Sequence, residues 1–146
     1  NVSTYIHPYV YPMFIILLPF ETPRWMILPL AFAVGFSIDM FNNTAGMHAA
    51  ACVFIAFARP WLIKRYTPIT GYENVNAPSL SELGVVWFAL FTLTVIFIHH
   101  SIYYFLQVFW MNDVGYLLLK IFLSTLVSTL LIVIFAFLFA KRKVKR

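Results

Sequence analysis

Six ionisable residues lie inside stretches of the chain that are otherwise apolar. A charged group within a membrane is costly, so it usually faces a protein neighbour or a water-filled cavity, and it often marks a functional site. A carboxylate beside an imidazole is typical of a proton-linked pair, and neighbouring histidines raise the question of a metal site. The six residues are Asp39, His48, Arg59, His99, His100 and Lys120.

Asp39 and His48 stand on either side of a short turn, residues 42–45, between two apolar segments. Each belongs to a stripe of mostly small residues, which lets two helices approach closely. One interpretation is a small polar site or proton-linked pair. The other is a lock that fixes the packing of the hairpin, and we favour it because polar pairs inside membranes often hold helices together. The stripes are Ala31, Gly35 and Asp39 before the turn and His48, Cys52, Ala56 and Arg59 after it.

The adjacent His99 and His100 do not form a metal-binding pattern. Neighbouring residues on a helix point about 100° apart, whereas helical zinc sites use spacings of three or four residues. His99 shares a helix face with Thr92 and Tyr103, so we expect it to make a structural hydrogen bond. No metal or other cofactor is expected.

Two cations lie within apolar segments. Arg59 directly precedes Pro60, and we expect its guanidinium to reach the lipid headgroups, with a contact to a partner protein as the alternative. Lys120 lies in the last segment, and we expect it to extend outward. It heads a polar face that continues with Ser124 and Ser128, with Thr125 and Thr129 beside them. Such a hydroxyl stripe usually packs against other helices, although it could also line a cavity.

No pattern typical of an enzyme accompanies these residues. The sequence has no nucleotide-binding loop, nucleophile elbow, cysteine cluster or paired acidic motif. Glu21, Glu73 and Glu82 fall in expected loops or caps. We therefore expect a protein without catalytic activity.

The composition indicates which elements must position these residues. The 146 residues are 62% hydrophobic and 10% charged, whereas soluble domains are about 25% charged. A soluble domain could not hide so much apolar surface, so the chain belongs in a lipid bilayer. Because a membrane helix takes about 20 residues, we expect an all-α polytopic membrane protein, a compact bundle of five segments in a single domain. The segments are residues 5–20, 23–41, 46–63, 80–106 and 113–140.

Local signals refine two of these segments. The segment at 5–20 contains Pro8, Pro12 and Pro19 and is short for a span, which predicts a broken or half-inserted helix. Ser79 followed by Glu82 is a capping-box pattern at the start of the segment at 80–106.

The basic residues predict the orientation. With the basic tail, 141–146, in the cytoplasm, nine of the ten Lys and Arg residues fall on the cytoplasmic side and Lys120 is the exception, as the positive-inside rule requires. The outer connections, 42–45 and 107–112, contain no Lys or Arg. This topology places Asn1 outside the cytoplasm, so we expect a preceding helix that brings the total to six. We expect the tail to contact lipid headgroups rather than nucleic acid.

The hairpin resembles the bacterial rod shape-determining protein family MreD. Within residues 17–60 the motifs are G-x-x-x-D at Gly35 and Asp39, the Asn-rich turn that begins at Asn42, and G-x-H at Gly46 and His48. Further similar motifs are HPYVYP at 7–12, GYE at 71–73 and IHH at 98–100. The resemblance covers most of the chain.

The resemblance implies a multi-pass protein of the bacterial inner membrane that is a non-catalytic scaffold or regulator of cell elongation and peptidoglycan synthesis. Its implied partners are MreC and, with it, the MreB cytoskeleton, the RodA glycosyltransferase and a class B penicillin-binding transpeptidase. The residues that we expect to make structural or partner contacts are Gly35, Asp39, Asn42, Gly46, His48, Arg59, His99 and Lys120.

Two other function classes stay open. The MreD family is similar in fold to the S-components of energy-coupling-factor transporters, so the alternative is a substrate-binding subunit of such a transporter. That subunit needs an outward pocket with converging polar groups, and the expected outer ends offer Asp39, Asn42, Asn43, His48, Gln107 and Asn112. A membrane enzyme that uses Asp39 with His48 or His99 is the least favoured class because no nucleophile or metal cluster accompanies them.

Overall fold

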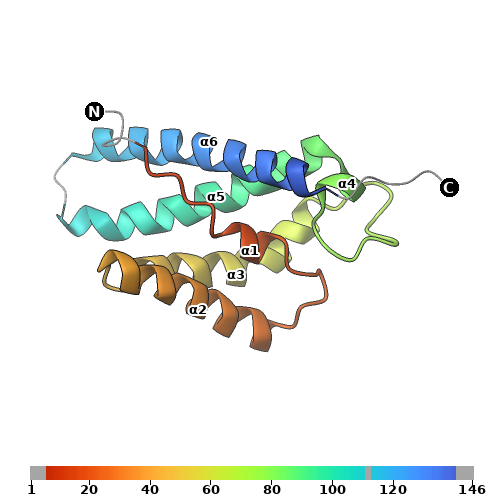
Figure 1. Cartoon of the computed structure of the whole chain (residues 1–146), viewed down its shortest axis with the longest axis horizontal. Helices are drawn as coiled ribbons and strands as arrows, with labels where there is room; N and C mark the ends of the chain where they lie inside the picture. Colours follow the sequence, from red (N-terminus) through yellow and green to blue (C-terminus); the bar gives the residue numbers. More distant parts are fainter. Residues whose placement is uncertain (1–5, 111–112, 141–146) are drawn as a thin grey trace.

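The structure, a computed structural model, describes residues 6–110 and 113–140. Over these ranges it is all-helical and has no strand. Four of its helices are long and apolar enough to cross a membrane, so the chain is a multi-pass α-helical membrane protein (Figure 1). The elements are α1 (Met13–Ile16), α2 (Arg24–Asn42), α3 (Met47–Arg65), α4 (Leu80–Leu83), α5 (Val85–Gln107), the 3₁₀ turn η2 (Val108–Trp110) and α6 (Val114–Phe139).

The four long helices run back and forth along the long axis of the molecule (Figure 1). Helix α3 packs against α2 on one side and α5 on the other, and α5 packs against α6. Small buried residues in the middle of α3, Ala51, Cys52 and Ala56, allow this central helix to be approached from both sides. Helix α2 therefore lies at the edge of the bundle.

The expected segment at 5–20 does not form a membrane-spanning helix. Residues 6–10 have no helical structure, and α1 contains only 4 residues. Pro8 and Pro12 explain the difference, since proline lacks the N–H that a helix interior needs and restricts the residue before it to extended backbone. We call residues 6–20 the N-terminal strap; Figure 1 shows it crossing the bundle between the α2–α3 and α5–α6 pairs.

The other four expected segments coincide with helices. Their boundaries differ from the expected ones by one or two residues, except that Gly84, at φ 87°, divides the segment at 80–106 into α4 and α5. The predicted cap at Ser79 is confirmed, because its hydroxyl accepts the N–H of Glu82 at 3.3 Å. The expected tail at 141–146 and Asn112 lie outside the described residues.

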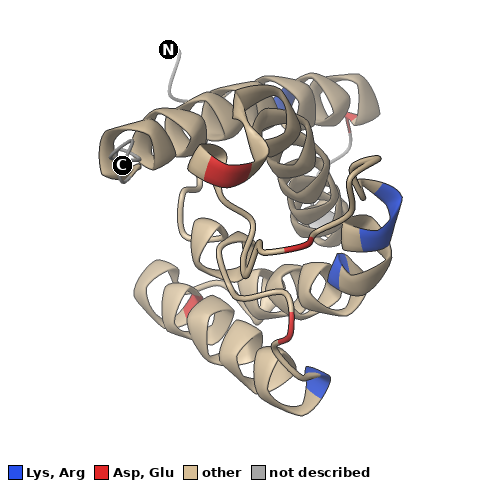
Figure 2. Ribbon diagram, turned by 90° about the vertical axis from the view of Figure 1, so that its right-hand side faces the viewer, with Lys and Arg blue, Asp and Glu red and all other residues tan. Residues whose placement is uncertain are grey.

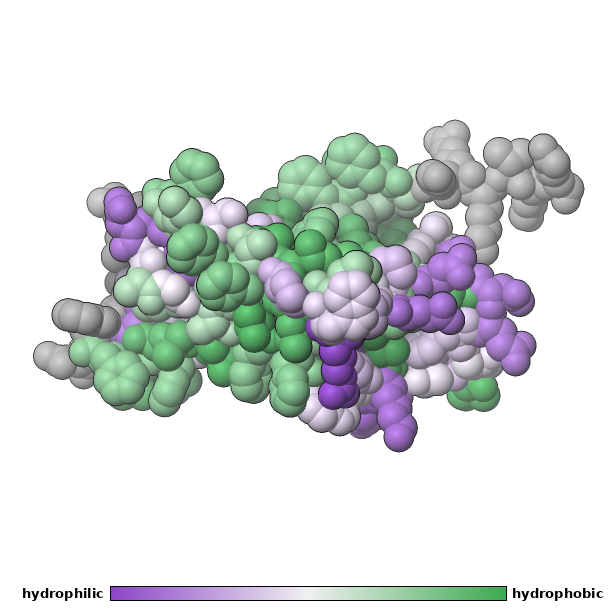
Figure 3. Space-filling view, turned by 90° about the horizontal axis from the view of Figure 1, so that it is seen from below, coloured by the Kyte–Doolittle hydropathy of each residue, from purple (hydrophilic) through white to green (hydrophobic). Residues whose placement is uncertain are grey.

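The basic residues that the structure describes gather at one end of the bundle, apart from Lys120. We call this the basic end; it holds Arg24 at the start of α2 and Arg59, Lys64 and Arg65 in the second half of α3. Figure 2 faces this end and shows the blue positions on the ribbons of α2 and α3. Figure 3, seen from the side of α2, shows a broad hydrophobic surface along the bundle and hydrophilic residues gathered toward the right-hand, basic end.

The long connection at the basic end folds back on the helices. The Tyr72 hydroxyl donates to the carbonyl of Ile63 at 2.6 Å, and partial burial raises the pKa of the Tyr72 phenol, which keeps this donor protonated. The N–H of Phe20 donates to the carbonyl of Asn76 at 2.8 Å. These bonds fix the end of the strap beside the loop between α3 and α4.

Candidate functional site

The centre of the bundle holds a polar core in which one tyrosine bridges two histidines. The Tyr11 hydroxyl lies 2.7 Å from Nδ1 of His48 and 2.6 Å from Nε2 of His99. A hydroxyl carries one proton, so it donates to one imidazole and accepts an N–H from the other. The bridge therefore ties the strap to both α3 and α5, with one imidazole as hydrogen-bond acceptor and the other as donor.

Aromatic rings enclose this bridge. The ring of Tyr9 lies edge-on to His48 with centroids 4.9 Å apart, and it lies 5.7 Å from His100. Tyr103 packs against His48 at 4.3 Å between centroids. His99 and His48 are both fully buried. Rings from the strap, α3 and α5 thus interlock at one level of the bundle.

The histidines do not form a metal centre in the part of the chain that the structure describes, where no group of three His, Cys, Asp or Glu side chains could hold an ion. One nitrogen of each of His48 and His99 is occupied by the Tyr11 hydroxyl. Nδ1 of His100 lies 3.0 Å from the carbonyl of Ile96. The expected structural hydrogen bond of His99 is present, and its partner is Tyr11.

The backbone of the strap is held by the hydroxyl stripe of α6. The N–H of His7 donates to Oγ of Ser124 at 3.2 Å, and the N–H of Tyr9 donates to Oγ of Ser128 at 3.0 Å. Residues four apart on a helix are separated by about 6 Å, and residues two apart in an extended chain by about 6.6 Å. The two spacings match, so the stripe satisfies an extended segment rather than packing only against helices.

Arg59 does not extend out of the protein toward the lipid headgroups, and that expectation is wrong. The side chain is 3% exposed. It donates from one terminal nitrogen to the carbonyl of Leu18 and from the other to the carbonyl of Pro19, the latter at 3.3 Å. The strap leaves α1 at this point with carbonyls that no helix satisfies, and a buried guanidinium is the donor that they find.

Asp39 closes the opposite end of the α2–α3 hairpin. Its Oδ1 accepts the N–H of His48 at 3.0 Å and the hydroxyl of Thr44, and its Oδ2 accepts the N–H of Ala49 at 2.9 Å. The carboxylate thus caps the first turn of α3, where the helix dipole also favours negative charge. It contacts the backbone of His48, whose imidazole turns to Tyr11, so the geometry is that of the hairpin lock.

The close approach at this lock depends on Gly35. A Cβ atom on Gly35 would lie 2.5 Å from Cα of Ala49 and 2.6 Å from the carbonyl oxygen of His48. Such contacts are with backbone, which cannot move aside as a flexible side chain can. The turn itself uses left-handed backbone at Asn43, φ 54°, and Gly46, φ 79°, a conformation that asparagine and glycine adopt most easily.

The remaining expected site residues lie apart from the polar core. The Asn42 amide donates to the carbonyl of Ile38 at 2.9 Å on the exposed side of α2. The expected outward extension of Lys120 stays a prediction. Its side chain is 8% exposed, and its ammonium lies 5.1 Å from the ring centre of Tyr104. It also lies 5.9 Å from the ring centre of Tyr116, so aromatic faces surround the charge.

Tyr9 and Tyr11 are not among the site residues expected from the sequence. A signal was available in the HPYVYP motif, where two tyrosines lie two positions apart between two prolines. Residues two apart point to the same side of an extended chain, so the alternation could have predicted an extended segment with both rings on one face.

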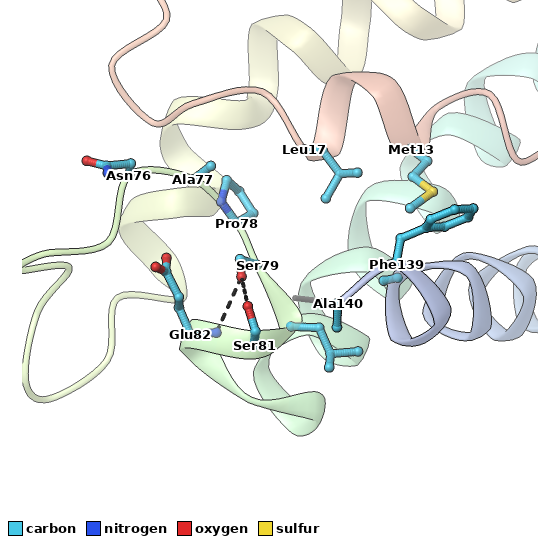
Figure 4. A pocket seen from close by; sticks show the side chains of 12 residues that line it. Met13, Leu17, Asn76, Ala77, Pro78, Ser79, Ser81, Glu82, Phe139 and Ala140 are labelled. Carbon is cyan, nitrogen blue, oxygen red and sulfur yellow. Dashed lines mark hydrogen bonds between the residues drawn. The ribbon is translucent and has the colours of Figure 1, made fainter. Parts of the chain in front are cut away.

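A pocket of about 470 Å³ opens at the basic end, between α1, residues 76–82 and the end of α6. Figure 4 shows Met13, Leu17 and Phe139 on one side of it and Ser79, Ser81 and Glu82 on the other. None of the residues expected to form a site lines this pocket.

Comparisons of the chain with protein-family models, with curated proteins and with solved structures found no match.

Proposed function

We propose that this chain is a non-catalytic membrane scaffold of a bacterial cell-elongation complex, similar to the MreD family. The observation that supports this proposal is the geometry of the hairpin whose motifs resemble that family. Gly35 and Asp39 both serve contacts between α2 and α3. A scaffold needs such a rigid element so that its outer faces can be recognised by other membrane helices.

The use of the buried polar groups also supports a scaffold. Asp39 and Arg59 bind backbone groups, and Tyr11 joins His48 to His99. A catalytic or transport site needs converging polar groups that face an open cavity. Here these groups hold the strap and the hairpin in place.

Helix α2 is the docking face that we propose for the membrane helix of MreC. Only 22% of its apolar span is buried, against 39% for each of α3, α5 and α6. The rings of Phe32 and Phe36 stack on its outer side with centroids 5.6 Å apart, and they are 51% and 46% exposed. Aromatic anchors of this kind give a partner helix a large, rigid contact surface.

In this proposal the chain lies in the bacterial inner membrane with the basic end and the C-terminus in the cytoplasm, as the positive-inside rule requires. The cytoplasmic side would then face the MreB cytoskeleton, while RodA and the class B transpeptidase join through MreC.

The transporter alternative has less support from the geometry. An S-component needs a ligand pocket at the end that holds Asp39 and Asn42, whereas the pocket of about 470 Å³ lies at the opposite, basic end. We retain it as the competing outcome of the experiment.

The test is site-specific photo-crosslinking in native membranes, followed by gentle detergent extraction through a tag and mass spectrometry. A benzoylphenylalanine replaces Phe36 on α2, and the matched control replaces Leu130, which is 60% exposed on α6. We expect a crosslink to MreC from position 36 and none from position 130.

Equal crosslinking from both positions would contradict the α2 face. Absence of MreC, RodA and the transpeptidase from the extract would contradict the scaffold function. Recovery of a pair of ATPases with a coupling membrane subunit would establish the transporter alternative instead.

A further inference from the structure

A second, smaller pocket lies at the basic end where the strap turns into α2. Its volume is about 220 Å³. Phe20, Ile27 and Ile63 give it an apolar wall, and Thr22, Arg24 and Arg59 give it a polar one. We call it the Arg24–Arg59 pocket. It is distinct from the polar core around Tyr11 and from the α2 face proposed for MreC.

Arg59 places a buried positive charge in the wall of this pocket. The side chain is 3% exposed, and its terminal nitrogens bond to backbone carbonyls of the strap. Its Nε is buried and has no hydrogen-bond partner. Carbonyl dipoles offset only part of a full charge, so the pocket keeps a positive potential in a region of low dielectric.

The N-terminus of α2 adds to this potential. The helix has 19 residues, it begins at Arg24, and its N-cap residue Pro23 offers no side-chain cap. There is no acidic residue in its first turn. The free N–H groups and the dipole of a helix N-terminus attract anions, and here they lie beside two arginines.

The surroundings indicate the level of the membrane interface. The Arg24 guanidinium lies 5.6 Å from the ring centre of Trp61, which is 54% exposed, and the neighbouring Trp25 is 76% exposed. Exposed tryptophans of membrane proteins gather at the headgroup level. The nearest acid in the sequence, Glu21, does not line the Arg24–Arg59 pocket; it lines a separate pocket with Pro19 and Tyr72.

We propose that the Arg24–Arg59 pocket binds the phosphate group of an anionic phospholipid. Arg24 and the first N–H groups of α2 contact the phosphate, and the buried Arg59 supplies a positive electrostatic potential. The apolar wall contacts the first carbons of the acyl chains, next to the glycerol backbone. Basic pockets between membrane helices are known to hold lipid headgroups in this way. Such a lipid would brace the strap, α2 and α3 at the point where Arg59 joins them.

The test is native mass spectrometry of the full chain in detergent, titrated with dioleoylphosphatidylglycerol or dioleoylphosphatidylcholine. The key variant is Arg24→Gln. Its matched control is Arg65→Gln, which removes the same charge from an exposed position at the same end but outside the pocket. An arm with inorganic phosphate as competitor separates a lipid source from free phosphate.

We expect wild type to prefer phosphatidylglycerol, Arg24→Gln to lose about tenfold in affinity, the effect of about one charged contact, and Arg65→Gln to change less than twofold. The site would be overturned if phosphate displaced the lipid from wild type but bound to Arg24→Gln as tightly as to wild type. Displacement by phosphate at concentrations below those of the lipid would assign the same site to free phosphate.

Equal losses in the two variants would overturn the proposal in favour of general surface charge, and so would the absence of a preference between the lipids. Arg59→Gln adds a second check, because loss of the buried charge should weaken lipid binding even with the Arg24 contact intact. If that variant does not fold, the comparison of Arg24→Gln with Arg65→Gln still decides.

Discussion

Asp39 and Arg59 are opposite charges that are buried to the same extent at the two ends of the α2–α3 hairpin. Each is 3% exposed. Asp39 accepts N–H groups of residues 9 and 10 positions later, whereas Arg59 donates to carbonyls 40 and 41 positions earlier. Backbone groups are thus the main partners of both charges, and the two charges do not pair with each other.

The two sets of contacts, the Asp39 lock and the Arg59 lock, differ in which parts of the chain must already be folded before they can form. The Asp39 lock needs only a short turn and two helices that follow one another in the chain. The Arg59 lock needs the strap to have crossed the bundle, because only then do the carbonyls of Leu18 and Pro19 meet the guanidinium. We infer that the Asp39 lock stabilises the hairpin itself and that the Arg59 lock forms only when the strap is packed in place.

The largest effect is expected from Gly35→Leu, which removes the close approach on which the Asp39 lock depends. The first added atom would meet the backbone of Ala49 at 2.5 Å, so the free energy of unfolding should fall by more than about 3 kcal/mol, the upper end for overpacked sites. The measurement is unfolding by sodium dodecyl sulfate, followed by circular dichroism. Gly115→Leu is the control, since a Cβ there meets only the Asp113 side chain at 3.5 Å; equal stability of the two variants would refute the close packing.

Asp39→Ala should follow, with a loss of about 3 kcal/mol in unfolding free energy, because two N–H groups and a hydroxyl lose a charged acceptor. The control Asp113→Ala removes an exposed cap that accepts one N–H, from Tyr116 at 3.1 Å, and should cost about 1 kcal/mol. Both are measured by the same unfolding assay. A loss at Asp39 no greater than that at Asp113 would show that the lock adds nothing beyond an ordinary helix cap.

Arg59→Met should release the strap at a cost of about 2 kcal/mol, as two carbonyls lose a charged donor. Cys52 is the one cysteine of the chain and is fully buried beside His99, so its rate of modification by a small thiol reagent reports opening of the strap. We expect the rate to rise about thirtyfold, at about 1.4 kcal/mol for each factor of ten. The control Arg65→Met should leave the rate unchanged, and an unaltered rate in Arg59→Met would break the distinction between the two locks.

Tyr11→Phe should have the smallest effect, about 1.5 kcal/mol, because His48 and His99 each lose the hydroxyl bound to one ring nitrogen while the aromatic ring still fills its place. The same modification of Cys52 measures it, with an expected rise of about tenfold. Tyr66→Phe is the control, since its hydroxyl partner Thr94 also donates to the carbonyl of Leu90. If Tyr66→Phe raised the rate as much, the Tyr11 bridge would not be a special part of the strap's attachment.

The sequence by itself determined the protein class and the four long helices, and it favoured a lock at the hairpin turn over a proton-linked pair. These features depend on composition, on helical spacing and on contacts between neighbours in the chain, which a sequence displays directly. Gly35 and Asp39 of α2 could be recognised because the short turn to α3 leaves the start of α3 beside them.

Only the tertiary structure decided the course of the strap and the partners of Tyr11, Arg59 and the α6 hydroxyl stripe. The bridge of Tyr11 joins residues 37 and 88 positions away, and the bond from Tyr9 to Ser128 spans 119 positions. Inside a membrane such polar groups cannot hydrogen-bond to water. They therefore need partners in the protein, but the sequence does not show which residues these are. The packing of the bundle selects the partners, and this is why Arg59, expected at the headgroups, instead holds the carbonyls of a distant segment.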